Sequence, residues 1–246
     1  TVKGIVLDAT CALMMKETTS HQAFVVGENE GIVSGCTNKA HITYTRSTDT
    51  PMLSRVFGTI VGFSKGLVEN CHNEGNITIT IPKLDYTVTD ELKKQHQRVG
   101  GVVGGFGVTS GVSGVVGCTN TGNITYKFMG APQNDLRPHF AIGGVCAVVA
   151  DNGSPISSTS AVDNGTIERC TNSGEIKLYQ EQILGSNYSN VGGVVGYLEG
   201  TISGCVNEAT GKVRLEVKNN SGSLPLKINS LVFSENFTQQ QAYVFD

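Results

Sequence analysis

The chain has no tryptophan, only 16% charged residues, and no apolar run long enough to span a membrane as a helix. Its formal net charge is -3 and it lacks basic runs, so it offers little attraction to nucleic acid or to an anionic lipid surface. No Cys-x-x-Cys pair occurs, which removes the usual spacing of a zinc site. We therefore expect no nucleic-acid partner, no membrane insertion of this segment, no metal and no cofactor.

Glycine is abundant, with 31 residues in a chain of 246. This composition is typical of a turn-rich, all-β protein and atypical of an α/β enzyme. The chain begins at Thr1, without a methionine or an apolar leader. We expect a mature or trimmed chain from which any targeting segment was removed.

A Cys-x-Asn tripeptide occurs five times and marks an internal repeat. The cysteines are Cys36, Cys71, Cys118, Cys170 and Cys205, and the asparagines are Asn38, Asn73, Asn120, Asn172 and Asn207. Successive cysteines are 35, 47, 52 and 35 residues apart. The repeat is therefore a unit of about 35 residues, with insertions in its middle copies.

Each copy contains three segments. The first is a strand of small residues such as Gly100 to Gly104, and the second carries an apolar residue three positions before the cysteine. The residue just before the cysteine is Gly35, Asn70, Gly117, Arg169 or Gly204. Four of these tolerate a left-handed bend, and Arg169 is the exception. The third segment alternates apolar and polar residues, as in Ile77 to Ile81, which predicts a half-buried strand.

Three short strands per unit cannot bury an apolar face alone and must stack on neighbouring copies. The predicted fold is an all-β parallel β-helix (β-solenoid), right-handed, with three short strands per coil and about five coils. A β-propeller is the alternative. The predicted domains are an N-terminal cap at 1–21, a solenoid at 22–218, and a C-terminal cap or linker at 219–246. The predicted repeats lie near 22–46, 56–81, 98–128, 141–180 and 191–218.

The segment Val191 to Ile202, followed by Cys205 and by Gly211-Lys212-Val213, resembles the GLUG-motif repeats of bacterial surface proteins. The Cys-x-Asn form, as in Cys71 to Ile77, is similar to that of Bacteroides-type surface proteins. The resemblance covers about residues 22 to 218. Other copies depart from the pattern at Ala23, Phe24, Thr59 and Ala147. The resemblance implies a surface-exposed solenoid of adhesin-like proteins, without an active site, and an outer-membrane anchor in a Bacteroides-type protein.

The repeated cysteines and asparagines are expected to form two structural ladders inside the solenoid. In-register thiols in a parallel stack point the same way, which favours buried free thiols over disulfides. Each asparagine faces the turn before the third segment, where its amide can bond backbone groups that have no strand partner.

Repeat proteins concentrate function in insertions and exposed faces, because their core positions are committed to packing. The candidate binding residues are Tyr86, Arg98, Arg137 and His139, which lie in or beside the insertions 82–98 and 129–140. These insertions could instead cap the sheet edges. A stripe of Phe63, Phe106 and Tyr197 is a further candidate for sugar stacking, against the alternative of buried corner packing.

These features predict an extracellular or cell-surface binding and adhesion module that is not an enzyme. The expected partner is a glycan or a protein at the cell surface, and we expect the chain to be part of a longer, anchored protein. One alternative is a polysaccharide lyase or hydrolase of the β-helix kind, although the acidic residues are scattered among loops. The other is a structural stalk.

Overall fold

The structure is a computed structural model that describes residues 1–15, 21–46, 55–82, 96–107, 113–129, 139–149, 165–182 and 189–219. These residues contain no helix and form five parallel β-sheets, here called A to E. Sheet A contains β1 (Val2–Lys3), β5 (Ile32–Ser34), β10 (Leu67–Glu69), β15 (Gly114–Val116), β20 (Gly165–Glu168) and β25 (Gly200–Ser203). Sheet B contains β2 (Val6–Leu7), β6 (Thr37–Asn38), β11 (His72–Asn73), β16 (Thr119–Asn120), β21 (Thr171–Asn172) and β26 (Val206–Asn207).

The other three sheets have five strands each. Sheet C contains β3 (His21–Gln22), β8 (Arg55–Gly58), β13 (His96–Gly100), β18 (His139–Gly143) and β23 (Ser189–Gly192). Sheet D contains β4 (Val26–Asn29), β9 (Val61–Ser64), β14 (Val103–Phe106), β19 (Cys146–Val149) and β24 (Val195–Leu198). Sheet E contains β7 (Ile42–Thr45), β12 (Ile77–Ile81), β17 (Ile124–Phe128), β22 (Ile176–Gln182) and β27 (Val213–Asn219).

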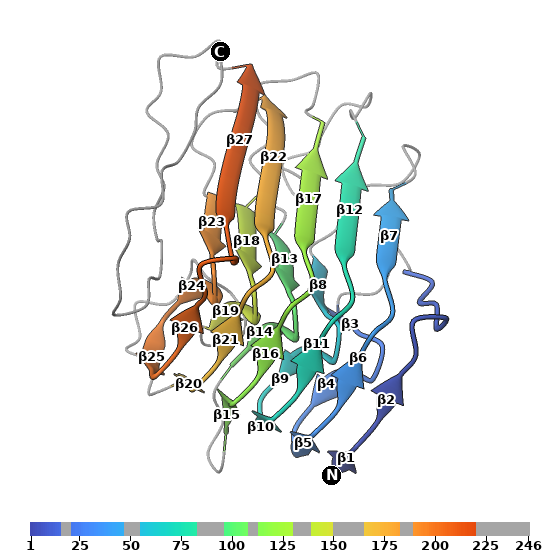
Figure 1. Cartoon of the computed structure of the whole chain (residues 1–246), viewed down its shortest axis with the longest axis vertical. Coiled ribbons are helices and arrows are strands. Elements are labelled where there is room, and N and C mark those ends of the chain that lie inside the picture. The colour runs from blue at the N-terminus through green and yellow to red at the C-terminus, as the bar shows by residue number, and fades with distance from the viewer. Residues whose placement is uncertain are drawn as a thin grey trace.

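The chain visits the sheets in the order C, D, A, B and E, and then returns to sheet C one rung further along. Figure 1 shows this order most clearly in sheet E, where β7, β12, β17, β22 and β27 lie side by side in sequence order. Every strand pairing among the described residues is parallel, as in Ile77 to Ile81 against Ile124 to Phe128. The predicted parallel β-helix is therefore confirmed, and the β-propeller is wrong because its blades require antiparallel strands.

Each full rung has five short strands, whereas the sequence predicts three. The segment Gly58 to Gly62, which is the copy of Gly100 to Gly104 one rung before, was expected to be one strand, but Gly58 ends β8 and Gly62 belongs to β9. A Cβ atom on Gly58 would lie 2.2 Å from the carbonyl oxygen of Val61, so a glycine is needed for the chain to turn this tightly. The bend before each cysteine divides the second segment in the same way, into strands of sheets A and B.

That bend has the expected left-handed backbone. The φ angles are 59° at Gly35, 50° at Asn70, 60° at Gly117, 50° at Arg169 and 57° at Gly204. Gly4 has a φ of 67°, and it marks a partial rung formed by β1 and β2 ahead of the five full rungs. In this partial rung, Leu7 pairs with Asn38 and therefore occupies the asparagine position.

The interior contains two apolar clusters. One joins sheets C and E and includes Phe57, Val99, Tyr126 and Phe140. The other joins sheets A and D and includes all of the repeat cysteines, with Cys205 at its partly buried end. The apolar residue three before the cysteine is fully buried in four copies, at Val33, Val68, Val115 and Ile167, and its fifth copy, Ile202, packs against the same cluster.

Candidate functional site

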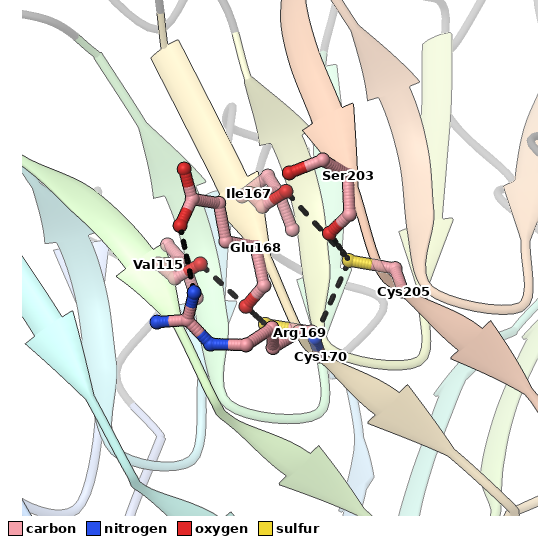
Figure 2. Close-up of polar contacts among 7 residues, drawn as sticks. All are labelled: Val115, Ile167, Glu168, Arg169, Cys170, Ser203 and Cys205. Carbon is pink, nitrogen blue, oxygen red and sulfur yellow. Dashed lines mark hydrogen bonds and ion pairs between the residues drawn. The ribbon is translucent and has the colours of Figure 1, made fainter.

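The five repeat cysteines lie in register, one above another. The amide of the residue after each of the last four cysteines donates to the carbonyl of the cysteine one rung before, for example from Thr119 to Cys71 at 2.9 Å and from Thr171 to Cys118 at 3.0 Å. The thiols are free, as expected. Figure 2 shows the last two, in which the Cys205 sulfur faces the carbonyls of Ile167 and Ser203 and accepts from the Cys170 amide at 3.3 Å.

Burial opposes the ionisation of several thiols in and beside this column. It raises the pKa of the Cys36 thiol, and it raises the pKa of the Cys118 thiol well above its ordinary value. Cys146, which sits in sheet D and packs in the same cluster, also has a pKa raised by burial. These three protonated thiols, surrounded by apolar side chains, are poor nucleophiles and act as packing. Side-chain hydrogen bonds with Cys118 and Cys205 lower the pKa of Cys170 to about 4, and one with Cys118 lowers the pKa of Cys71.

The repeat asparagines form a continuous hydrogen-bonded ladder in sheet B. Each side-chain amide donates to the side-chain carbonyl of the next rung, over 2.8 Å from Asn38 to Asn73 and 2.7 Å at each later step. Each also donates to a carbonyl of its own turn, such as Asn120 to Gly122 at 2.8 Å. Asn38, Asn73, Asn120 and Asn172 are fully buried. Because buried amides must be paired, this ladder holds the rungs in one register.

Glycines pack directly against the asparagine ladder. A Cβ atom on Gly122 would lie 2.0 Å from the carbonyl oxygen of Gly75, and one on Gly101 would lie 2.6 Å from the side-chain oxygen of Asn120. The turn position of Gly122 is occupied by Ala40 in the first full rung. The ladder asparagines therefore require glycine at the backbone positions that pack against them.

A second pair of columns lies where sheets C and D meet, facing away from the two apolar clusters, and most of its members are 7% exposed or less. We call it the outer seam, and it consists of His21, Val56, Arg98, Ala141 and Asn190 from sheet C with Glu28, Phe63, Gly105, Val148 and Tyr197 from sheet D. The sheet C members alternate with inward residues, as Arg98 does between Gln97, which accepts from the Tyr126 hydroxyl, and the core residue Val99.

The two columns of the seam contact each other. The rings of His21 and Phe63 stack with centroids 5.1 Å apart, and the His21 ring bonds the Glu28 carboxylate. Ala141 and Val148 share a small apolar cluster against which Tyr197 packs. The Tyr197 hydroxyl donates to the Glu199 carboxylate at 2.6 Å, and burial, together with this carboxylate, raises the pKa of Tyr197 to about 12.

Arg98 sits in the middle of the outer seam and is only 7% exposed. It makes no hydrogen bond or ion pair in the described structure, and its Nε is buried without a partner. Burial lowers the pKa of Arg98 to about 10, so the guanidinium still carries its charge at neutral pH. Gly105 stands at the same level in sheet D, and the Phe63 ring and a Val56 methyl group lie 2.9 and 3.1 Å from the place where its Cβ atom would be.

Asn190, two rungs further along the same column, resembles Arg98 in this respect. It is 6% exposed, and its Oδ1 is buried without a partner. The residue between them is Ala141, whose side chain is small. The seam therefore presents one unpaired donor and one unpaired acceptor on either side of an alanine.

Of the four binding residues predicted from the sequence, the structure fully places only Arg98. The sequence puts Arg98 at the end of an insertion, whereas it lies within β13. His139 begins β18, but its side chain, like Tyr86 and Arg137, lies outside the described residues. The strands that flank the insertions 82–98 and 129–140 belong to sheets E and C.

Of the two interpretations of Phe63, Phe106 and Tyr197, buried packing is confirmed for Phe63 and Phe106, which are 7% and 0% exposed. Phe63 and Tyr197 belong to the outer seam, but Phe106 is fully buried in the cluster between sheets A and D. Gly105, and not Phe106, pairs with Phe63. The sequence alignment of the repeats was shifted by one residue here, because Gly105 has no side chain to mark its position.

Sequence reasoning also missed an outer ladder at the turn before sheet E. The Asn76 side chain accepts from the Asn123 amide at 2.9 Å, and the Asn123 side chain accepts from the Glu175 amide at 2.8 Å. His41 accepts from the Asn76 amide at 3.0 Å and starts this ladder. The only available signal was an asparagine three residues after two of the repeat asparagines.

No family model, no curated protein and no solved structure matches this chain. Within the described ranges, no helix is long and apolar enough to cross a membrane. In the same ranges, no group of three or more His, Cys, Asp or Glu side chains is arranged to hold a metal ion.

Proposed function

We propose that this chain is a non-catalytic binding module of a bacterial cell-surface protein, which attaches to a glycan or to a matrix protein. The observation that carries the proposal is the outer seam, where the charged Arg98 is 7% exposed and its Nε is buried without a partner. Folding gains nothing from such a group, because a buried donor without a partner destabilises the native state. A ligand that supplies the missing acceptor gives the residue a role.

The contrast with the interior supports this assignment. Inside, the asparagine amides are paired along the ladder and the thiols are buried among apolar side chains. The resemblance to surface repeats, on the residues given above, favours an extracellular location.

An array of glycans and matrix proteins tests this function. The purified chain should bind at least one of them saturably, and Arg98→Met should weaken that binding. Turnover of plant and host polysaccharides should be measured in parallel, because release of new chain ends would favour a polysaccharide-cleaving enzyme instead. A protein that neither binds nor cleaves any member of the panel would contradict the proposal and favour a structural stalk.

A further inference from the structure

We propose that residues 226–235 dock on the last full rung as an incomplete sixth rung, adding one parallel strand to β23 in sheet C and one to β24 in sheet D. Residues 220–246 lie outside the described residues. The assignment therefore comes from their sequence and from the strand edges against which they would dock. The proposal names what covers this end of the solenoid, and it does not depend on the binding function.

The end of sheets C and D is buried, although β23 and β24 are the last strands of these sheets in the described structure (Figure 1). Val191, Val194 and Val195 are 4, 3 and 0% exposed. At the opposite end of the Val194 and Val195 columns, Val25 and Val26 of the first full rung are only partly buried. An outermost rung has no neighbour on one side, so full burial of its side chains requires a further segment against it.

The end of sheets A and B is not buried in this way. In the same last rung, Ile202 and Cys205 are only partly buried, and Val206 is 44% exposed. Their counterparts one rung before, Ile167 and Cys170, are fully buried. The covering segment therefore reaches sheets C and D and leaves sheets A and B open.

The sequence after β27 continues the register of the last full rung without a gap. β22 and β27 pair from Ile176 with Val213 to Gln182 with Asn219, so equivalent residues are 37 positions apart. The same interval connects the three buried valines of the last full rung with three apolar residues, namely Ile228, Leu231 and Val232. An apolar residue thus falls at each of the three inward positions, as strands of sheets C and D require.

The match stops at the boundary that burial indicates. Carried further, the same interval places Gln239 at the position of Ile202 and Val244 at that of Asn207. A glutamine is a poor replacement for an inward apolar side chain, and a valine cannot continue the asparagine ladder. The sequence therefore supports new strands in sheets C and D and none in sheets A and B.

The sixth rung departs from the inner rungs at glycine positions, as the first full rung does. The Gly192-Gly193 pair is replaced by Asn229-Ser230 here and by Ala23-Phe24 at the other end. A Cβ atom on Gly193 would lie 2.3 Å from the side chain of Asn207, and the sixth rung has no such asparagine. Phe233 stands at a further glycine position and has no such explanation.

The hydrogen bonds between rungs specify the contact. The amides of Val145 and Cys146 donate to the Val194 carbonyl of the next rung, at 2.9 and 3.0 Å. One rung further along, the amides of Val194 and Val195 should donate to the Leu231 carbonyl. These two amides therefore report directly on the proposed docking.

Hydrogen exchange of the whole chain, resolved by residue with NMR, tests the proposal. The amides of Val194 and Val195 should be protected in the wild-type chain. Leu231→Asp should speed their exchange by about tenfold or more, because it places a carboxylate among apolar side chains, and should leave Val115 in the middle of sheet A unchanged. Ser234→Asp is the matched control: it adds the same charge at an outward position and should leave all three amides unchanged.

Each outcome either supports the docked segment or removes it. Unprotected amides at Val194 and Val195 in the wild-type chain would overturn the proposal without any variant. Equal effects of Leu231→Asp and Ser234→Asp, or no effect of either, would overturn it as well. Protection that weakens on dilution would assign the cover to a second copy of the chain and would also overturn it. Failure to bind any glycan or matrix protein would contradict only the proposed function.

Discussion

Two sets of columns run along this solenoid, and they differ in how completely their polar groups are satisfied. The asparagine ladder is buried, and each of its four steps carries a short inter-rung hydrogen bond. The outer seam is also mostly buried, but it contains Arg98 and Asn190 with unpaired atoms. Burial alone therefore does not identify a structural residue. The partners of its polar atoms distinguish a group that supports the fold from one whose burial the fold does not explain.

The largest expected difference between ladder and seam comes from adding one methyl group to a glycine of each. Gly122→Ala should lower the free energy of unfolding by at least about 3 kcal/mol or prevent folding, because the new Cβ atom would lie 2.0 Å from the Gly75 carbonyl oxygen. Gly105→Ala should cost about 1 kcal/mol, since its Cβ would meet the ends of the Phe63 and Val56 side chains, at 2.9 and 3.1 Å. Urea unfolding measures both, and equal losses would contradict the contrast.

The next largest effect should come from interrupting the ladder. Asn120→Leu should lower the free energy of unfolding by about 3 kcal/mol, because Asn73 and Asn172 each lose a partner. Asn38→Leu should cost about half as much, since it removes the end of the ladder and leaves only Asn73 with a lost bond. Leu7 already occupies the position below it. If the two variants lost the same stability, the ladder would not act as a connected unit.

The thiol column predicts a loss of stability at alkaline pH. Burial raises the pKa of Cys118 and Cys146 in the folded protein above the unfolded value of 9.0, so their stabilising effect is complete below pH 9 and falls as the pH rises further. Each thiol should contribute a slope of about 1.4 kcal/mol per pH unit above pH 9. Unfolding curves at several alkaline pH values measure the slope.

The matched variant for that measurement is Cys118→Ala, which should have a shallower slope than the wild-type chain. An unchanged slope in this variant would mean that the Cys118 thiol titrates no differently in the folded and unfolded states.

The smallest effect concerns the bend before the fourth repeat cysteine. Arg169 has a φ of 50°, where three of the five repeat copies have glycine. Arg169→Gly should raise the free energy of unfolding by about 1 kcal/mol, because it relieves this strain. The ion pair that is lost, between Arg169 and Glu168, is exposed and contributes little. Gly35→Ala should lower the free energy of unfolding by a similar amount, because Gly35 has a φ of 59° and the added Cβ atom would have no neighbour within 4 Å. Thermal melting of the two variants measures these opposite changes. A lower melting temperature for Arg169→Gly than for the wild-type chain would show that Arg169 has another role.

The sequence was sufficient to predict the parallel stack, because Cys-x-Asn fixes one register position in every rung. It was also sufficient to predict left-handed bends, since Gly35, Gly117 and Gly204 mark them. It did not predict the five strands per rung, because a turn as tight as that at Gly58 leaves no polar loop in the sequence. The outer seam was hidden as well: His21, Val56, Arg98, Ala141 and Asn190 share no residue type, and only the strand pairing shows that they form one column.

The most direct test of the contrast is the change in unfolding free energy caused by Arg98→Met. A buried charged group without a partner costs stability, and methionine is a flexible apolar replacement for it. The account predicts that Arg98→Met is as stable as the wild-type chain or more stable, by about 1 kcal/mol. A loss of 2 kcal/mol or more, comparable to that of a ladder asparagine, would contradict it and would make Arg98 part of the structural framework.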